Sequence, residues 1–235
     1  ECRDILNRTA EKLGLEILAY RKVPVNTADI GTTALSVEPE MEQVFVACPD
    51  HISNPEEFER KLFVLRNYAS HLINNTVRKD DIGFYMASLS YKTIVYKGQL
   101  TSHQVRQYFP DLSNKRVVSA FGLVHSRFAT NTFPSWKLAQ PFRFIAHNGE
   151  INTLQGNLNW LKTSEKGFTT PYSSKEEMEM LLPIVTEGQS DSACQRRVEE
   201  THRRLAGKPD QRKPDGHSAH RHGCEQLPGI APELH

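Results

Sequence analysis

Residues 124–160 read VHSRFATNTFPSWKLAQPFRFIAHNGEINTLQGNLNW, which is the most informative segment of the chain. Apolar and β-branched residues at 117–128 and again at 142–147 predict two strands, each of which runs into a polar loop. The first loop carries Arg127 and Asn131, and the second carries Asn148 and Gly149. Residues 155–165 then have the pattern of a helix. Because polar loops at strand ends commonly form binding sites, we expect both loops to face one ligand.

The residue types in these loops suit a small zwitterionic ligand and an acyl-transfer reaction. The planar fork of Arg127 fits a carboxylate better than a lysine would. Asn148 offers an amide donor beside the unobstructed backbone N–H of Gly149, and two convergent donors are what a tetrahedral oxyanion needs. An Asn-Gly pair between apolar runs is also typical of a tight hairpin turn. The dipeptide alone leaves both interpretations open.

The rest of the chain predicts a mixture of helices and strands. Helical spacing of apolar residues predicts a helix near residues 5–13 that stops at Gly14, followed by strands at 15–25 and 43–48. Asn54-Pro55 marks a helix start before a stripe of apolar residues, and residues 84–100 suit a hairpin ahead of a short helix at 101–108. We therefore expect one α+β domain over residues 1–195. The stripe comprises Phe58, Leu62, Leu65, Ala69 and Leu72.

Composition narrows the functional class. The chain has 235 residues, 38% hydrophobic content and a formal net charge of +1, so nothing global favours nucleic acid or an anionic membrane as a partner. No apolar run approaches the roughly 18 residues of a membrane helix. Four scattered cysteines lack disulfide or metal spacing, which favours a reducing compartment and hence the cytoplasm.

Residues 196–235 form a basic, His-rich tail that we expect to be poorly ordered or unrelated to the domain. Its abrupt change of character also fits translation in a shifted reading frame. A zinc site in this tail lacks standard ligand spacing, and nucleic-acid binding is disfavoured by the balanced charge; we therefore predict no metal site and no nucleic-acid partner. The ligands of the disfavoured zinc site would be His217, His220, His222 and Cys224, and the nucleic-acid contacts would be Arg203, Arg204, Arg212, Lys213 and Arg221.

The motifs HSRFATNTFPSW, LAQPFR and AHNGEINTLQGNLNW closely resemble the glutamine amidotransferase type 2 domain of the glutamate synthase large chain. Flanking pieces agree in order, among them QVFVACP at residues 43–49 and TEGQSDS at residues 186–192. The resemblance extends to about Cys194. It implies an N-terminal-nucleophile hydrolase-like αββα sandwich, incomplete at both ends of this chain. The implied activity is hydrolysis of L-glutamine to glutamate and ammonia.

The resemblance also implies roles for individual residues. Arg127 corresponds to the residue that binds the glutamine α-carboxylate, and Asp191 to the one that receives the α-ammonium group. Asn148 and Gly149 correspond to the oxyanion hole. We expect His125 and His147 to be structural, and Phe133, Trp136 and Trp160 to pack in the interior.

One departure concerns the nucleophile, which in this family is a cysteine at the start of a Cys-Gly-rich strand. Cys2 is followed by a helix-like sequence and is not its counterpart, while Cys48 and Cys194 are expected to be buried or neutral thiols. The chain should therefore bind glutamine but be inactive alone. The alternative is a non-catalytic, amidotransferase-like module that binds glutamine as a signal.

Partners and cofactors follow from the resemblance only. Ammonia would pass to a second domain for reductive amination of 2-oxoglutarate. Flavin mononucleotide, an iron–sulfur cluster and NAD(P)H or ferredoxin would bind outside this chain. L-glutamine, the remainder of the glutamate synthase chain and its small subunit are the candidate partners, with no membrane among them.

Overall fold

The computed structural model describes residues 1–77, 83–126, 128, 133–141, 154–165, 173–184 and 201, and its longest element is helix α3 (Pro55–Thr76). Asn54 caps this helix, since its Oδ1 accepts a hydrogen bond of 2.9 Å from the backbone N–H of Glu56. The predicted apolar stripe is buried from Phe58 to Ala69. At its end Ile73, four residues after Ala69, is buried, while Leu72 is only half-buried, so Ile73 and not Leu72 continues the buried face.

Helix α1 (Cys2–Lys12) packs on α3 and is followed by a two-stranded antiparallel sheet. Gly14 ends the turn after α1 with a φ of 68°, a conformation that glycine adopts without strain. Strand β1 (Glu16–Lys22) pairs with β2 (Glu42–Ala47), and the register shifts between Ile17 and Ala19. The helix and both strands expected in this region are thus confirmed, with bounds that differ from the expected ones by one to three residues.

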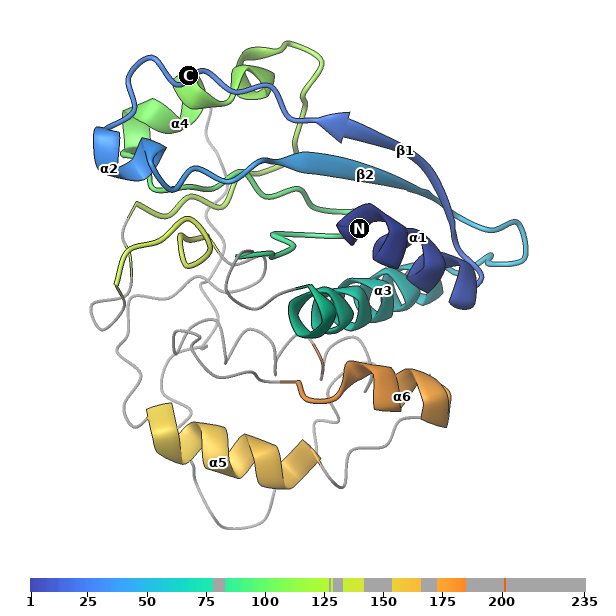
Figure 1. Ribbon diagram of the computed structural model, residues 1–235. Coiled ribbons are helices and arrows are strands. Elements are labelled where there is room, and N and C mark those ends of the chain that lie inside the picture. The colour runs from blue at the N-terminus through green and yellow to red at the C-terminus, as the bar shows by residue number, and fades with distance from the viewer. Residues whose placement is uncertain are drawn as a thin grey trace, which may run out of the picture.

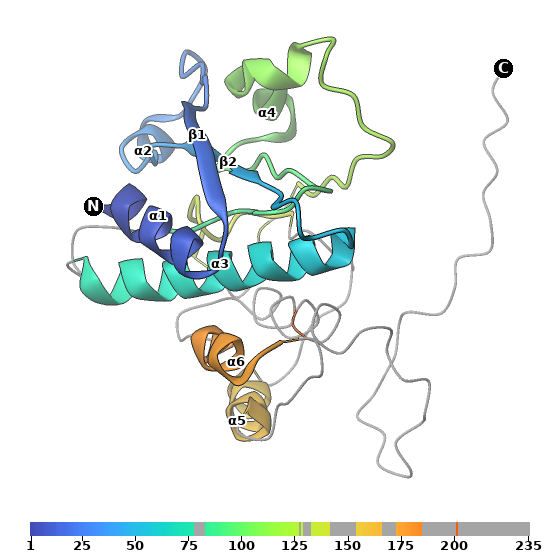
Figure 2. The ribbon, with the colours of Figure 1, turned by 90° about the vertical axis from the view of Figure 1, so that its right-hand side faces the viewer.

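Helix α3 lies at the centre of the described elements (Figure 1). The strands and α1 lie on one side of it, and α6 (Lys175–Leu181) packs on the other side (Figure 2). A first core cluster joins these layers through Leu6, Leu65 and Leu181, which are 5%, 0% and 2% exposed. The helices thereby bury their apolar faces against one another and against the sheet.

A second core cluster lies beyond the end of β1, where short elements meet. It contains Val23, Tyr108, Phe109 and Trp136. The rings of Tyr108 and Phe109 meet edge to face with centroids 4.7 Å apart. The contributing elements are α2 (Thr32–Leu35), α4 (Ser102–Tyr108) and the 3₁₀ helix η1 (Pro110–Ser113). Through Trp136, this cluster supports residues 133–141.

Some expected elements differ from the structure. The hairpin expected at residues 84–100 is wrong, because residues 83–100 are irregular. The strand expected at 117–128 is absent among the described residues of that range. The helices expected at 101–108 and 155–165 are confirmed as α4 and α5 (Leu154–Glu165). The strand expected at 142–147, and the tail apart from Thr201, lie outside the described residues.

A mixed α/β architecture is therefore established for the described residues. Across those same residues, no helix combines the length and apolarity that crossing a bilayer requires.

Candidate functional site

The four residues assigned to the site from the sequence, Arg127, Asn148, Gly149 and Asp191, lie outside the described residues, as does His147. The structure therefore does not test their mutual geometry. It does describe residues 133–141, which lie along the chain between Arg127 and the Asn148-Gly149 pair. The contacts of this segment show how the chain supports the region in which the predicted site residues lie.

Aromatic residues of the segment divide between interior and surface. Trp136 is 3% exposed and its indole N–H donates to the carbonyl oxygen of Ala34 at 2.9 Å, which confirms the expected packing role. Phe133 is 90% exposed, so the expectation that it packs in the interior is wrong. The Trp160 side chain lies outside the described residues. His125, expected to be structural, is half-buried.

Lys97 holds the middle of the segment. Its ammonium group donates hydrogen bonds to the carbonyl oxygens of Lys137 at 2.7 Å and Ala139 at 2.9 Å, and the residue is 9% exposed. The same ammonium lies 5.4 Å from the ring centroid of Tyr85, within the range of a cation–π contact. Burial raises the pKa of the Tyr85 phenol to about 12, so the ring stays neutral.

Two neighbours of Lys97, Gly98 and Gln99, also contact residues 133–141. The side-chain amide of Gln99 donates to the carbonyl oxygen of Pro134 at 2.9 Å. Gly98 faces Trp136 so closely that a Cβ atom at position 98 would lie 2.7 Å from Cε3 of the indole, nearer than real side chains approach. Lys97 and Gln99 therefore hold residues 133–141 by hydrogen bonds, and Gly98, which lies between them in the chain, packs closely on Trp136. We call residues 97–99 the anchor.

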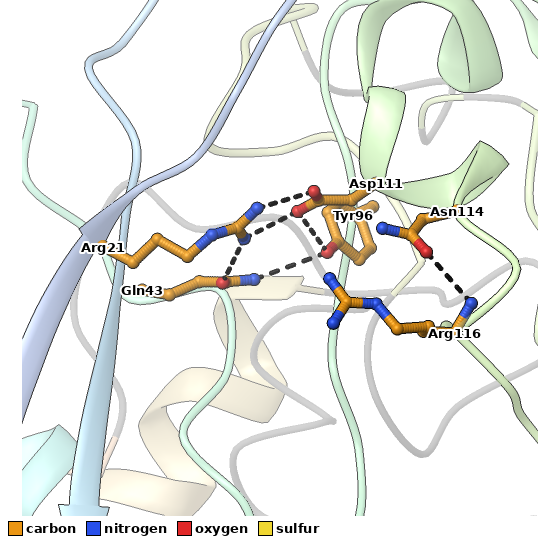
Figure 3. A network of polar contacts seen from close by, with 6 residues as sticks. All are labelled: Arg21, Gln43, Tyr96, Asp111, Asn114 and Arg116. Atoms are coloured by element: carbon orange, nitrogen blue, oxygen red, sulfur yellow. Dashed lines mark hydrogen bonds and ion pairs between the residues drawn. The ribbon is translucent and has the colours of Figure 1, made fainter.

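A network of polar contacts holds Tyr96, the residue directly before the anchor (Figure 3). Arg21 makes a bidentate contact with Asp111, with N–O distances of 2.7 and 2.8 Å, and also donates to the side-chain oxygen of Gln43. The hydroxyl of Tyr96 donates to Asp111 at 3.0 Å. The network thus joins β1, β2 and η1 to the backbone that leads into Lys97. Nearby, the Asn114 side chain accepts from the backbone N–H of Arg116 at 3.0 Å.

The protonation states in this network follow from its contacts. The Arg21 hydrogen bonds hold the pKa of Asp111 below its ordinary value, and the Tyr96 hydroxyl adds to this. Burial, with a further contribution from Asp111, raises the pKa of Tyr96. At neutral pH the network therefore contains one carboxylate, one guanidinium and one neutral phenol, and the carboxylate accepts hydrogen bonds from the other two groups.

Sequence reasoning missed Lys97 and Gln99. Both lie in the stretch YKGQL, which we interpreted as part of a hairpin. The available signal was a lysine within an apolar and aromatic run, where its long side chain is likelier to be buried than on an open surface loop. The carbonyl partners, 40 and 42 residues away, give no signal of their own.

The described cysteines show no arrangement for catalysis. Cys2 begins helix α1 rather than a strand, as expected. Cys48 directly follows β2 and is exposed, so its expected place within a strand and the expectation of burial are wrong, while the alternative of a neutral thiol stays a prediction. Within the part of the chain that the structure describes, no group of three or more His, Cys, Asp or Glu side chains could hold a metal ion.

The family model of class-II glutamine amidotransferases matches residues 1–204. The chain belongs to this family. Arg127, Asn148, Gly149 and Asp191 all lie within the matched residues.

The similar proteins are glutamate synthases. Over 82% of its length the chain is 49% identical to glutamate synthase (NADH) of Schizosaccharomyces pombe. It is 45% identical over 80% of its length to the glutamate synthase (NADPH) large chain of Bacillus subtilis, and 42% identical over 76% to ferredoxin-dependent glutamate synthase 2 of Synechocystis. The matched regions span only 9%, 12% and 11% of these three proteins.

Proposed function

We propose that this chain is the glutamine-binding part of a glutamate synthase amidotransferase domain. Arg127 binds the α-carboxylate of L-glutamine, Asp191 binds its α-ammonium group, and Asn148 with Gly149 stabilises the oxyanion. The observation that carries the proposal is the family match over residues 1–204, which includes all four residues. The pairing of a guanidinium with a carboxylate and of a carboxylate with an ammonium supports it chemically.

The proposal includes a fold and a division of the chain. Residues 1–195 form part of an N-terminal-nucleophile hydrolase-like αββα sandwich, and residues 196–235 form a tail with a separate character. In the described residues, α1 packs against both α3 and strand β1 of a two-stranded antiparallel sheet, which supports a fold with helices on a sheet.

In the proposed reaction a cysteine thiolate adds to the side-chain amide carbon of glutamine. Ammonia leaves, a glutamyl thioester remains, and water then releases glutamate. The contribution of this chain is to orient the substrate and to donate hydrogen bonds to the oxyanion. Because Cys2 begins a helix and Cys48 follows β2, a polypeptide limited to these residues should bind glutamine without hydrolysing it.

The remaining steps belong to the parent protein. Ammonia would be used there for reductive amination of 2-oxoglutarate, with flavin mononucleotide, an iron–sulfur cluster and NAD(P)H or ferredoxin. The described cysteines, Cys2 and Cys48, do not supply the four thiolates of such a cluster. Relatives named for NADH, NADPH and ferredoxin match this region similarly, which supports placing donor recognition in other parts of the parent.

Calorimetric titration of the 235-residue chain with L-glutamine tests the proposal. Arg127→Ala should weaken binding at least about 30-fold, equivalent to about 2 kcal/mol, because a desolvated carboxylate loses its partner. Asp191→Asn should weaken it comparably. Arg116→Ala is the matched control, since Arg116 is exposed, and should bind as the unsubstituted chain does.

Two truncated ligands assign each contact. 4-Aminobutanamide lacks the carboxylate and 4-carbamoylbutanoate lacks the ammonium group. Arg127→Ala should lose the preference for glutamine over the first ligand, and Asp191→Asn should lose the preference over the second. If the unsubstituted chain binds no glutamine, or if each substitution affects both preferences equally, the assigned roles are wrong.

A non-catalytic glutamine-binding module is the second candidate, and the helical position of Cys2 favours it. Adding a peptide that begins with the Cys-Gly strand of the family discriminates between the two. Ammonia release on addition of the peptide supports the enzyme. Tight glutamine binding that never gives ammonia, with or without the peptide, supports the module.

A further inference from the structure

We propose that Lys97 is a positioning residue for glutamine binding: its buried ammonium holds residues 133–141, and through them the parts of the chain on either side that carry Arg127 and Asn148. This inference rests on the proposed function, because it assigns a role in binding the same ligand. Lys97 does not touch glutamine in this proposal. It acts through the backbone carbonyl groups that it binds.

The first argument is the contact geometry. A lysine ammonium is a strong donor, and here it bonds two carbonyl oxygens in one short segment, those of Lys137 and Ala139. The N–H groups of Leu138 and Ala139 both donate to the carbonyl oxygen of Ser135, at 3.1 and 3.0 Å. The segment is therefore a closed turn whose outward carbonyl oxygens meet one cation.

The second argument concerns the free energy that is needed to bury the ammonium group of Lys97. Removing an ammonium group from water is expensive, and an apolar side chain of similar volume commonly serves stability as well or better. Lys97 is nonetheless 9% exposed, and the described contacts of its ammonium include two backbone carbonyl oxygens of one short segment. A role in fixing the position of the turn explains why a charged donor occupies the site.

The third argument is covalent reach. Arg127 lies six residues before Phe133, and Asn148 lies nine residues after Ala139. A chain spans at most about 3.5 Å per residue, so anchoring residues 133–141 limits the volume that each flanking loop can sample. If an unanchored segment populates the competent arrangement only part of the time, the apparent affinity falls by that fraction.

The test compares three variants of the 235-residue chain. Lys97→Met removes the ammonium and keeps the length, and Lys97→Arg restores donors. Lys92→Met is the matched control, because Lys92 lies in the same irregular stretch but pairs with Glu56 on the surface. We expect Lys97→Met to raise the Kd for L-glutamine at least about tenfold, Lys97→Arg to recover part of this loss, and Lys92→Met to leave Kd unchanged.

Hydrogen exchange and a stability control separate positioning from general destabilisation. In Lys97→Met the amides of Leu138 and Ala139 should exchange faster while those of α3 keep their protection. Ile73→Val, a mild change in the first core cluster, should lower stability without raising Kd. If Lys97→Met binds glutamine as tightly as the unsubstituted chain, or if Ile73→Val weakens binding as much, the inference is wrong.

A second variant covers the case in which Lys97→Met does not fold. Gln99→Leu removes the half-buried side-chain contact to Pro134 and should raise Kd about two- to fivefold, the effect of losing one ordinary hydrogen bond. An unchanged Kd in Gln99→Leu would then overturn the inference. If the unsubstituted chain itself binds no glutamine, the proposed function is wrong. Faster hydrogen exchange at residues 138 and 139 in Lys97→Arg or Gln99→Leu would then show that the anchor holds the segment, but not that it has a role in glutamine binding.

Discussion

At the scale of single residues, the ion pair between Arg21 and Asp111 places two opposite charges where β1, β2 and η1 meet. Asp111 is 12% exposed at its side chain and Arg21 is 41% exposed. The pair has bidentate geometry, and the carboxylate also accepts from Tyr96. Such a pair contributes more than an open surface ion pair, because its geometry is fixed and its carboxylate is partly shielded from water.

Asp111→Asn should make stability less dependent on pH. The pKa of Asp111 is held below its ordinary value of 3.8 in the folded chain, chiefly by the Arg21 hydrogen bonds. A lowered pKa contributes stability above the unfolded pKa, and that contribution is lost as pH falls through the folded pKa. The variant should therefore be less stable than the unsubstituted chain at pH 7, and the difference should shrink as the pH falls below 3.8 and through the lowered pKa of Asp111 in the folded chain.

Urea unfolding followed at a series of pH values measures this difference. Glu40→Gln is the control, because Glu40 is 78% exposed and pairs with Lys22, which is 70% exposed. It should change stability little at any pH. A stability difference for Asp111→Asn that persists undiminished in acid would show that the carboxylate charge is not its cause.

At the scale of elements, local signals predicted the helices well. The Asn54 cap, Pro55 and the apolar stripe located α3, and Gly14 located the end of the α1 turn. These signals lie within a few residues of the structure they specify. That proximity is why sequence reasoning found them.

The irregular stretch at residues 83–100 shows where sequence reasoning failed. Glu59 of α3 is 2% exposed; it accepts a hydrogen bond from the Ser90 hydroxyl and one of 3.2 Å from the backbone N–H of Tyr91. The Ser90 oxygen in turn accepts from the backbone N–H of Lys92 at 3.1 Å. A buried carboxylate on a distant helix thus binds an amide that a hairpin would have used, and β propensity loses to that tertiary contact.

Gly98→Ala should separate the anchor from residues 133–141. The added methyl would meet the indole of Trp136 at less than contact distance, and overpacking of this kind costs about 1–3 kcal/mol. Gly122→Ala is the control, because a Cβ atom there would meet nothing within 4 Å. Thermal unfolding of both variants gives the comparison. Equal midpoints for the two variants would contradict the close approach of Gly98 to Trp136.

At the scale of the whole molecule, the described residues form two core clusters. The first lies among α1, α3 and α6, and the second contains Trp136 and supports the anchored segment. The motifs identified the family but not the second cluster, and the residues that they indicate for the site stay a prediction. The second cluster is assembled from residues 23, 108, 109 and 136, whose contacts no local periodicity encodes.

The two clusters should unfold as one unit, and Leu65→Ala tests this. Leu65 is 0% exposed in the first cluster, so truncating it should cost about 2–5 kcal/mol. In a Trp160→Phe background, emission reports Trp136 in the second cluster while circular dichroism reports the helices. Because small domains usually unfold cooperatively, both signals should shift to lower urea together, whereas Leu18→Ala, at a position 61% exposed, should shift neither. A circular dichroism transition that moves while Trp136 emission stays in place would mean that the anchored segment belongs to a separately folding unit, and glutamine affinity would then not follow the stability of α3.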